Sequence, residues 1–297
     1  MDLLQQTKYL CNLYDIKPVR SKGQNFLIKE EIYDDIIKAA DLKPDDIVLE
    51  VGPGLGFLTT KLAKKVKQVI AIELDDKLAG VLHMGLVSQK IKNVEVINED
   101  ILENQKFPKQ SIQDAMEQAK IKNQKYKIVA NLPFNITSIF LRKFLSDEIK
   151  PELMVLMLQK EVAERIIAKP PKMSLLAVSV QLYSQPEIVK IVLADNFWPK
   201  PAVDSAVVKL KIKNFQNCTQ DKQELKVSIP VDKEKYFFRL VKIGFSSKRK
   251  MLKNNLTAGY KIKSNEVENK LKNSNLDIKI RAENLSIADW IKLFGEF

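Results

Sequence analysis

The sequence predicts an α/β protein in which a doubly wound, mostly parallel sheet is followed by a small C-terminal helical domain. Three observations support this prediction. Short apolar runs alternate with segments of helical periodicity over the first 212 residues. The first of these runs ends in a glycine-rich turn, Gly52-Pro53-Gly54-Leu55-Gly56. Beyond residue 230 the periodicity is helical only.

The alternation starts at residues 29–42, where apolar side chains at helical spacing predict a helix that ends before Pro44. We then expect strands at Ile47–Val51, Gln68–Glu73, Val94–Ile97, Lys127–Ala130 and Leu153–Leu158. We expect helices at Phe57–Val66, Leu74–Val87, Ser138–Leu145, Lys160–Ala168 and Leu175–Tyr183. Crossover helices return each strand in the same direction, so the sheet should be parallel and covered on both faces.

The first domain should close with paired strands at Glu187–Val192 and Ala206–Ile212, separated by a loop over Phe197–Asp204. A polar, aperiodic stretch over 213–230 indicates a linker. The helices expected after it are Tyr236–Lys242, Lys248–Leu256, Asn265–Leu271 and Ile287–Phe294. We therefore divide the chain into domains 1–212 and 213–297. Residues 103–126 form a polar insertion to which we assign no chemistry.

Composition narrows the class of protein. A hydrophobic content of 45% supports a sizeable core, and a net charge of +12 attracts polyanions such as RNA. No stretch has the apolar length of a membrane span and the first twenty residues lack a signal-peptide core, so we expect a cytoplasmic location. Cys11 and Cys218 fall in different domains, and we expect no disulfide framework and no metal site. Nothing suggests a dimer interface, which favours a monomer.

The glycine turn after the first strand is typical of a loop that passes close to a ligand, with Gly52, Gly54 and Gly56 as its binding residues. A dinucleotide fingerprint requires a further glycine where this chain has Phe57. Glu50 precedes the loop, where a carboxylate would repel a pyrophosphate but could hold the loop amides or, through water, the cationic amino group of a methionine moiety. These features favour S-adenosylmethionine as cofactor.

Two further acids follow successive predicted strands. Glu73 closes the second strand and can accept hydrogen bonds from both ribose hydroxyls of the cofactor. Asp100 follows the third strand, where it can accept a hydrogen bond from the adenine amine. Ile101 adds a backbone amide and an apolar wall. Polar residues are common at strand ends, but three acids at three successive ends favour a cofactor site.

The fourth strand runs into Asn131-Leu132-Pro133-Phe134, which we interpret as the catalytic motif. An adenine amine is a poor nucleophile because its lone pair is delocalised into the ring. The Asn131 side-chain oxygen and the Leu132 carbonyl can accept both amine hydrogens and hold the nitrogen in a reactive geometry. Phe134 can stack on a flipped-out base. The alternative is an ordinary turn after a strand.

With these motifs the chain, from about Lys22 to Leu293, resembles the ribosomal RNA small-subunit adenine dimethyltransferase family of the KsgA/RsmA type. The resemblance rests on Gly23–Leu27, Glu50–Gly56, Glu99-Asp100, Asn131–Phe134, Gln159–Arg165, Phe197–Ser205, Phe245–Leu252 and Arg281–Ser286. It implies a class I methyltransferase with a Rossmann-like fold. It also implies that Asn25 and Leu27 close over the methionine end of the cofactor and that Asn131 is a cofactor-binding residue.

The family's reaction, as the resemblance implies it, is dimethylation of two adjacent adenosines near the 3′ end of 16S rRNA within an immature 30S-type particle. Phosphate contacts are expected from Lys248, Arg249, Lys250 and Lys253, although a solvated helix face is the alternative. The 103–126 stretch departs from the family's core. It leaves open whether that segment touches RNA.

Three other functions are alternatives to this one. A related class methylates large-subunit rRNA and confers macrolide resistance, but the segments 245–252 and 281–286 match the small-subunit type. An assembly factor with an idle site is disfavoured by intact Asn131, Pro133 and Phe134. A dinucleotide-dependent oxidoreductase is disfavoured by Glu50 and Phe57.

Overall fold

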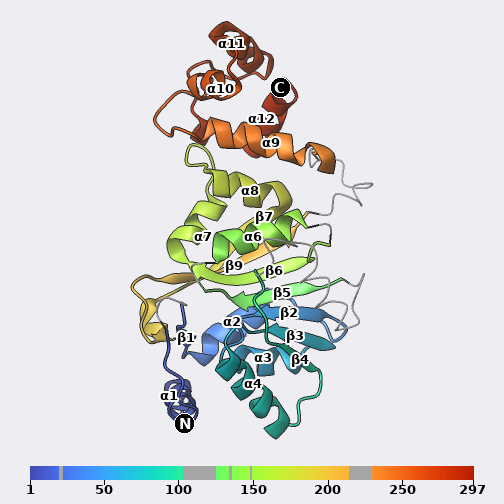
Figure 1. The fold of residues 1–297 in the computed structure, drawn as a ribbon, viewed down its shortest axis with the longest axis vertical. Helices are drawn as coiled ribbons and strands as arrows, with labels where there is room; N and C mark the ends of the chain where they lie inside the picture. Colours follow the sequence, from blue (N-terminus) through green and yellow to red (C-terminus); the bar gives the residue numbers. More distant parts are fainter. Residues whose placement is uncertain (20–22, 103–124, 134–135, 148, 214–228) are drawn as a thin grey trace. The chain divides into compact units, whose positions relative to one another are not determined.

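The computed structural model describes residues 1–19, 23–102, 125–133, 136–147, 149–213 and 229–297 (Figure 1). They form two compact units. The first comprises Met1–Ala163 and Pro186–Ile212, and the second comprises Glu164–Gln185 and Lys213–Phe297. One boundary coincides with the division expected after residue 212. The segment Glu164–Gln185, which the sequence-based division placed in the first domain, groups with the second unit instead.

A seven-stranded sheet organises the first unit, in the order β4-β3-β2-β5-β6-β9-β7 (Figure 1). Its strands are β2 (Ile47–Val51), β3 (Gln68–Ile72), β4 (Val94–Ile97), β5 (Lys127–Asn131), β6 (Leu153–Gln159), β7 (Ser184–Val192) and β9 (Ser205–Ile212). The neighbouring pairs from β4 to β6 are parallel, and β9 is antiparallel to β6. The expected mostly parallel, doubly wound sheet is confirmed.

The central strands are mostly apolar because helices cover the sheet. Every residue of β2 is buried, which is characteristic of a strand covered on both faces. The helices α2 (Glu30–Ala39) and α3 (Phe57–Ala63) share one apolar core with residues of β2, β5 and β6. α4 (Asp76–Ser88) contacts β4, and α6 (Thr137–Ser146) buries Phe140 and Phe144 completely.

The strand order reverses beside β2. The chain passes from β2 to β3 and β4 on one side of the sheet, and then returns to place β5 on the other side of β2. Crossover connections on opposite sides leave a crevice at the carboxyl ends of two such strands, and α/β proteins bind their ligands there. The ends of β2 and β5 are therefore the place to look for a site.

Two features of the first unit were not expected from the sequence. Helix α1 (Leu3–Leu13) starts at a capping box formed by Asp2 and Gln5. Its Cys11 lies in an apolar cluster with residues of α4 and of the glycine loop. The expected loop at Phe197–Asp204 begins instead with β8 (Phe197–Trp198), which pairs antiparallel with β1 (Phe26–Leu27).

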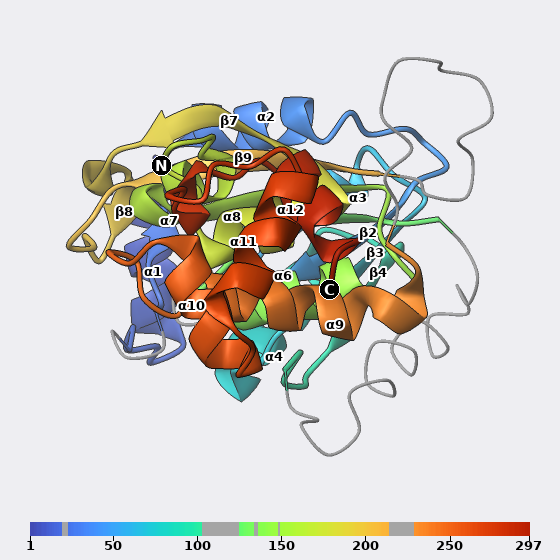
Figure 2. The same ribbon diagram turned by 90° about the horizontal axis from the view of Figure 1, so that it is seen from above.

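The second unit is helical, as expected (Figure 2). It contains α8 (Leu175–Tyr183), α9 (Val231–Gly244), α10 (Leu252–Tyr260), α11 (Ser264–Asn273) and α12 (Ile287–Phe294), and α7 (Lys160–Ile167) ends within it. α9 contacts α8, α10 and α12, and α10 lies beside α11. Phe237 and Trp290 are fully buried between these helices. No helix in the described part of the chain is long and apolar enough to cross a membrane.

The expectation of a helix over 248–256 was wrong at its start, because α10 begins at Leu252. Residues 248–250 form a turn instead. The buried Asn255 side chain holds this turn by donating to the carbonyls of Gly244 at 2.7 Å and Ser247 at 3.1 Å. A side-chain amide thus supplies the partners that helical backbone bonds would otherwise supply.

Candidate active site

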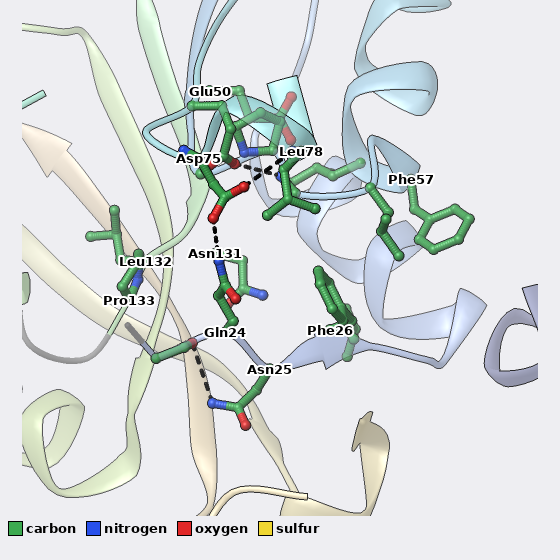
Figure 3. A pocket seen from close by; sticks show the side chains of 18 of the residues that line it. Gln24, Asn25, Phe26, Glu50, Phe57, Asp75, Leu78, Asn131, Leu132 and Pro133 are labelled. Atoms are coloured by element: carbon green, nitrogen blue, oxygen red, sulfur yellow. Dashed lines mark hydrogen bonds between the residues drawn. The ribbon is translucent and has the colours of Figure 1, made fainter. Parts of the chain in front are cut away.

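A pocket in the first unit opens at the carboxyl ends of β2, β3 and β5 (Figure 3). It lies at the place where the strand order reverses. It brings together nine of the residues that the sequence suggested for the site. These are Asn25, Leu27, Glu50, Gly52, Gly54, Glu73, Asn131, Leu132 and Pro133. They come from segments more than 100 residues apart in sequence, so the sheet topology assembles them.

The glycine loop between β2 and α3 has a backbone that suits glycine. Gly52, Gly54 and Gly56 have φ of +68°, +58° and +82°, in the left-handed region that disfavours other residues. A Cβ on Gly52 would lie 3.7 Å from the Asn131 carbonyl oxygen and from Cδ of Pro133. The loop therefore passes close to the end of β5, and the missing side chain leaves room between the two.

Glu73 connects this loop to β3. Its Oε2 accepts from the backbone N–H of Gly54 and its Oε1 accepts from that of Asp75, both at 3.0 Å. Burial raises the pKa of this carboxyl, and the two backbone hydrogen bonds oppose that rise. Each oxygen already holds one donor, whereas the sequence alone suggested two free oxygens. A carboxylate oxygen can accept more than one hydrogen bond, so the outer lone pairs stay available.

Among the described residues, Glu50 accepts no backbone hydrogen bonds like those that Glu73 accepts. The residue is 1% exposed, and its Oε2 has no hydrogen-bond partner among the described residues. Burial raises the pKa of Glu50 to about 8, and the nearby charge of Glu73 adds to the rise. The Thr59 hydroxyl opposes it, although its Oγ1 does not reach the geometry of a hydrogen bond. The pocket wall therefore contains a buried carboxyl oxygen, Glu50 Oε2, to which no described residue donates.

The end of β5 supplies Asn131, Leu132 and Pro133. Asn131 is half-buried, and its side chain makes no hydrogen bond to another described residue. Leu132 is 1% exposed, and its N–H donates to the Met157 carbonyl of β6 at 3.3 Å, which fixes the backbone as it leaves the sheet. Phe134, the fourth residue of the expected motif, lies outside the described residues.

A segment before β1 closes one side of the pocket (Figure 3). The Gln24 side chain accepts from the Val19 N–H at 2.9 Å and donates to Asp75 Oδ2 at 3.4 Å, which ties the segment to the start of α4. Tyr33 of α2 donates its hydroxyl to the Leu27 carbonyl at 3.0 Å. Burial raises the pKa of Tyr33, so it stays a donor.

Sequence reasoning missed Gln24, Tyr33 and Asp75 as pocket residues. The position of Asp75 in the sequence could have identified it as a pocket residue. It lies two residues after Glu73 and caps α4 by accepting from the N–H groups of Lys77 and Leu78, a frequent role for aspartate before a helix. Gln24 lies inside the Gly23–Leu27 motif, next to Asn25, and could have been included on that ground. Tyr33 had no such signal, because only the fold brings it to the pocket.

Three residues expected at the cofactor site do not line this pocket: Gly56, Asp100 and Ile101. A Cβ on Gly56 would lie 2.5 Å from Cδ1 of Leu82, so this glycine allows α3 and α4 to pack. The Asp100 carboxylate accepts from the Leu102 N–H at 2.7 Å, and the Ile101 carbonyl accepts from Lys143 Nζ at 2.6 Å. Asp100 and Ile101 directly precede residues 103–124, which lie outside the described part of the chain.

The basic residues expected to contact RNA all belong to the second unit. Lys248, Arg249 and Lys250 are exposed on the turn before α10. Lys253 differs from them, because its Nζ lies 2.9 Å from the Glu268 carboxylate of α11 and its side chain is 20% exposed. Among the described residues no three His, Cys, Asp or Glu side chains gather as they would to hold a metal ion.

The chain is similar to known proteins over nearly its whole length. A family model described as ribosomal RNA adenine dimethylase matches residues 17–297. The chain is 41% identical to a protein from Dehalococcoides mccartyi strain BAV1 named ribosomal RNA small subunit methyltransferase A, over 99% of this chain and 94% of that protein. A protein of the same name from Alkaliphilus metalliredigens is 37% identical, over 98% and 96% of the two chains.

Two solved structures share the fold. One is a dimethyladenosine transferase from Plasmodium falciparum, with a TM-score of 0.68 and 27% identity over 89% of this chain and 94% of that one. The other is the 23S rRNA methyltransferase ErmE, with a TM-score of 0.66 and 25% identity over 92% and 99% of the two chains. By the match of nearly its whole length to the family model, the chain belongs to the ribosomal RNA adenine dimethylase family.

Proposed function

We propose that this chain transfers methyl groups from S-adenosylmethionine to the 6-amino groups of two adjacent adenosines in the hairpin near the 3′ end of small-subunit (16S) rRNA. One observation carries the proposal: Glu50, the glycine loop, Glu73 and Asn131 line a single pocket where the strand order reverses. The names of the relatives at 37–41% identity support small-subunit RNA as substrate over the large-subunit RNA named for ErmE.

The residues of the pocket fit S-adenosylmethionine. Glu50 offers a buried carboxyl oxygen to which none of the described residues donates, which suits the cationic methionine end. Glu73 offers its outer lone pairs to the ribose hydroxyls. Because Gly52 has no side chain, the ligand can approach the backbone of the loop closely. Asn25 and Leu27 cover the methionine end. Asp100 and Ile101 follow β4 outside the pocket lining, and we assign them to the adenine end of the cofactor. Gly56, which allows α3 and α4 to pack, supports the loop without touching the cofactor. When bound, S-adenosylmethionine supplies a methyl group carried on a positively charged sulfur.

The motif at the end of β5 prepares the target amine. The Asn131 side-chain oxygen and the Leu132 carbonyl accept its two hydrogens, which directs the nitrogen lone pair out of the base plane. Asn131 is suited to this role because its side chain has no competing hydrogen bond among the described residues. Pro133 stiffens the turn, and Phe134 stacks on the flipped-out base. The methylated nitrogen is acidic, so its proton leaves to water without a dedicated base.

The second unit holds the RNA by its phosphates. Lys248, Arg249, Lys250 and Lys253 contribute salt-dependent affinity without reading base sequence. The net charge of +12 strengthens the attraction to an assembling ribosomal particle. We place the activity in the cytoplasm, on an immature 30S-type particle, with the chain acting as a monomer and without a metal ion.

The test is methylation of small ribosomal subunits that lack the modification. Purified protein is incubated with these subunits and labelled S-adenosylmethionine, and the methylated adenosines are mapped. The Asn131→Ala variant should lose activity by about 100-fold or more, since it removes a group that orients the amine. Asn12→Ala is the matched control, because Asn12 is exposed on α1 and should leave activity unchanged.

Each outcome separates the alternatives. Paired dimethyladenosines near the 3′ end of the small-subunit RNA, absent with Asn131→Ala, support the proposal. Methylation confined to large-subunit RNA would favour a resistance-type enzyme. Binding to the subunit without any methylation would favour an assembly factor with an idle site.

A further inference from the structure

We infer that Glu50 is a neutral carboxylic acid in the ligand-free pocket and releases its proton to solvent when a cation binds beside it, so that cofactor binding is coupled to proton release. The inference rests on the proposed function, because the methionine end of S-adenosylmethionine carries the cation.

Glu50 is buried inside the sheet of the first unit. The side chain lies on β2, an interior strand of the sheet, with β3 on one side and β5 on the other. It is 1% exposed, and Oε2 has no hydrogen-bond partner among the described residues. A carboxylate in such a place loses its hydration without gaining a substitute, so the neutral form is preferred.

The described groups around Glu50 are neutral or acidic. From α3 comes Thr59, a neutral hydroxyl. From α2 comes Tyr33, which donates its hydroxyl to the Leu27 carbonyl and not to Glu50. From β3 comes Glu73, a second acid, with Asp75 of the α4 cap beyond it. From β5 comes Asn131, which is neutral.

No cation thus faces Glu50 from the described elements packed around it, and two further acids lie near. These surroundings agree with the rise of the Glu50 pKa to about 8. Glu73 is different, because backbone amides of Gly54 and Asp75 support its charged form. Of the two neighbouring acids, Glu50 is therefore the one that carries a proton near neutral pH.

A cation entering the pocket reverses this preference. Attraction between opposite charges in a buried site favours the carboxylate over the acid. The O–H bond of Glu50 then breaks, the electron pair stays on the oxygen, and the proton passes to the buffer. The pocket gains a cation and loses a proton, so its net charge changes little.

The experiment is calorimetric titration of the protein with S-adenosylmethionine in buffers of different ionisation enthalpy, without RNA. We expect release of close to one proton per ligand bound at pH 7 and a dissociation constant that falls up to about tenfold per unit between pH 5.5 and 7. This window lies below the usual pKa of an α-amino group, so the charge of the ligand stays constant. Methylthioadenosine, which lacks the amino acid part, should bind without releasing a proton.

Variants assign the proton to Glu50. Glu50→Gln should bind the cofactor more weakly, with no proton release and no pH dependence in the same window. Glu187→Gln is the matched control, because Glu187 is exposed on β7, and it should behave as the wild type. If Glu50→Gln does not fold, infrared difference spectra of the wild type with carbon-13-labelled glutamate should show a protonated carboxyl band that disappears on binding.

The results separate the inference from the proposed function. Binding of S-adenosylmethionine without proton release, or equal release by Glu50→Gln, overturns the inference and leaves the function standing. Proton release by methylthioadenosine also overturns it, because no cation would then be needed. Failure to bind S-adenosylmethionine, together with failure to methylate the small subunit, overturns the proposed function itself.

Discussion

Glu73, next after the last residue of β3, accepts a hydrogen bond of 3.0 Å from the backbone N–H of Gly54, in the loop that follows β2. One side chain thus holds the ligand-facing loop against the neighbouring strand. Its other oxygen holds the Asp75 N–H at the start of α4. Glu73 therefore shapes the pocket as well as lining it.

Glu73→Gln should weaken S-adenosylmethionine binding by about 10- to 100-fold, because hydrogen bonds to a charged group contribute about 1.5–3 kcal/mol. The amide can accept on one side only and would turn a donor towards one backbone N–H. Calorimetry measures the loss, with Glu187→Gln as the exposed control. Unchanged affinity would show that the loop keeps its shape without this carboxylate.

Gln24→Ala should raise the KM for S-adenosylmethionine about fivefold with little change in kcat, since loosening this segment costs about 1 kcal/mol, the contribution of one hydrogen bond. The variant frees the segment before β1 from Asp75 and Val19. Steady-state methylation of small subunits at varied cofactor concentration measures it. Gln89→Ala, exposed at the end of α4, serves as control. A fall in kcat alone would contradict a role in holding the cofactor.

Gly56→Ala should destabilise the fold by about 1–3 kcal/mol, through a strained positive φ and a forced shift of Leu82. Its Cβ would lie 2.5 Å from Cδ1 of Leu82. The matched control is Gly80→Ala in α4, where an added Cβ would meet no atom of the described residues within 4 Å apart from its own helix backbone and chain neighbours. That change should stabilise the helix by about 0.5–1 kcal/mol. Urea unfolding monitored by circular dichroism distinguishes the two.

Glu50→Gln should stabilise the ligand-free protein at pH 8 and above, and should have little effect near pH 4.5. The folded pKa of Glu50 is raised to about 8. Its stabilising contribution is therefore complete below the unfolded value and is lost as the pH rises through 8. The expected gain is a few kcal/mol at pH 9. Thermal unfolding at several pH values measures it, and a difference that is independent of pH would contradict the burial argument.

Replacing Lys248, Arg249 and Lys250 together by alanine should weaken RNA binding and reduce its salt dependence. Each lost phosphate contact lowers the slope of log affinity against log salt by about 0.7–0.9. Lys253→Ala should have a smaller effect, because Glu268 already pairs with that ammonium. Filter binding to small-subunit RNA over a range of salt concentrations tests both. An unchanged slope for the triple variant would indicate a solvated surface.

The local signals in the sequence were sufficient for most elements. Leu175–Tyr183 and Ile287–Phe294 are helices with the expected bounds, because each presents apolar residues at helical spacing and starts at a serine cap. The first parallel strand, Ile47–Val51, also has its expected bounds. The start of α10 was misplaced, since Lys248–Lys250 have ordinary helix propensity and the buried Asn255 amide, which lies further along the chain, stabilises a turn there.

The sequence by itself determined the strand ends at which Glu50, Glu73 and Asn131 stand, because hydrophobic periodicity and glycine turns are local properties of the chain. Only the tertiary structure decided which of those ends meet. The strand order placed β5 beside β2 and so brought Asn131 to Glu50, and the pairing of β1 with β8 brought Gln24 and Leu27 to the pocket. Burial without a partner, which sets the charge of Glu50, depends on every element packed around it and cannot be read from neighbours in sequence.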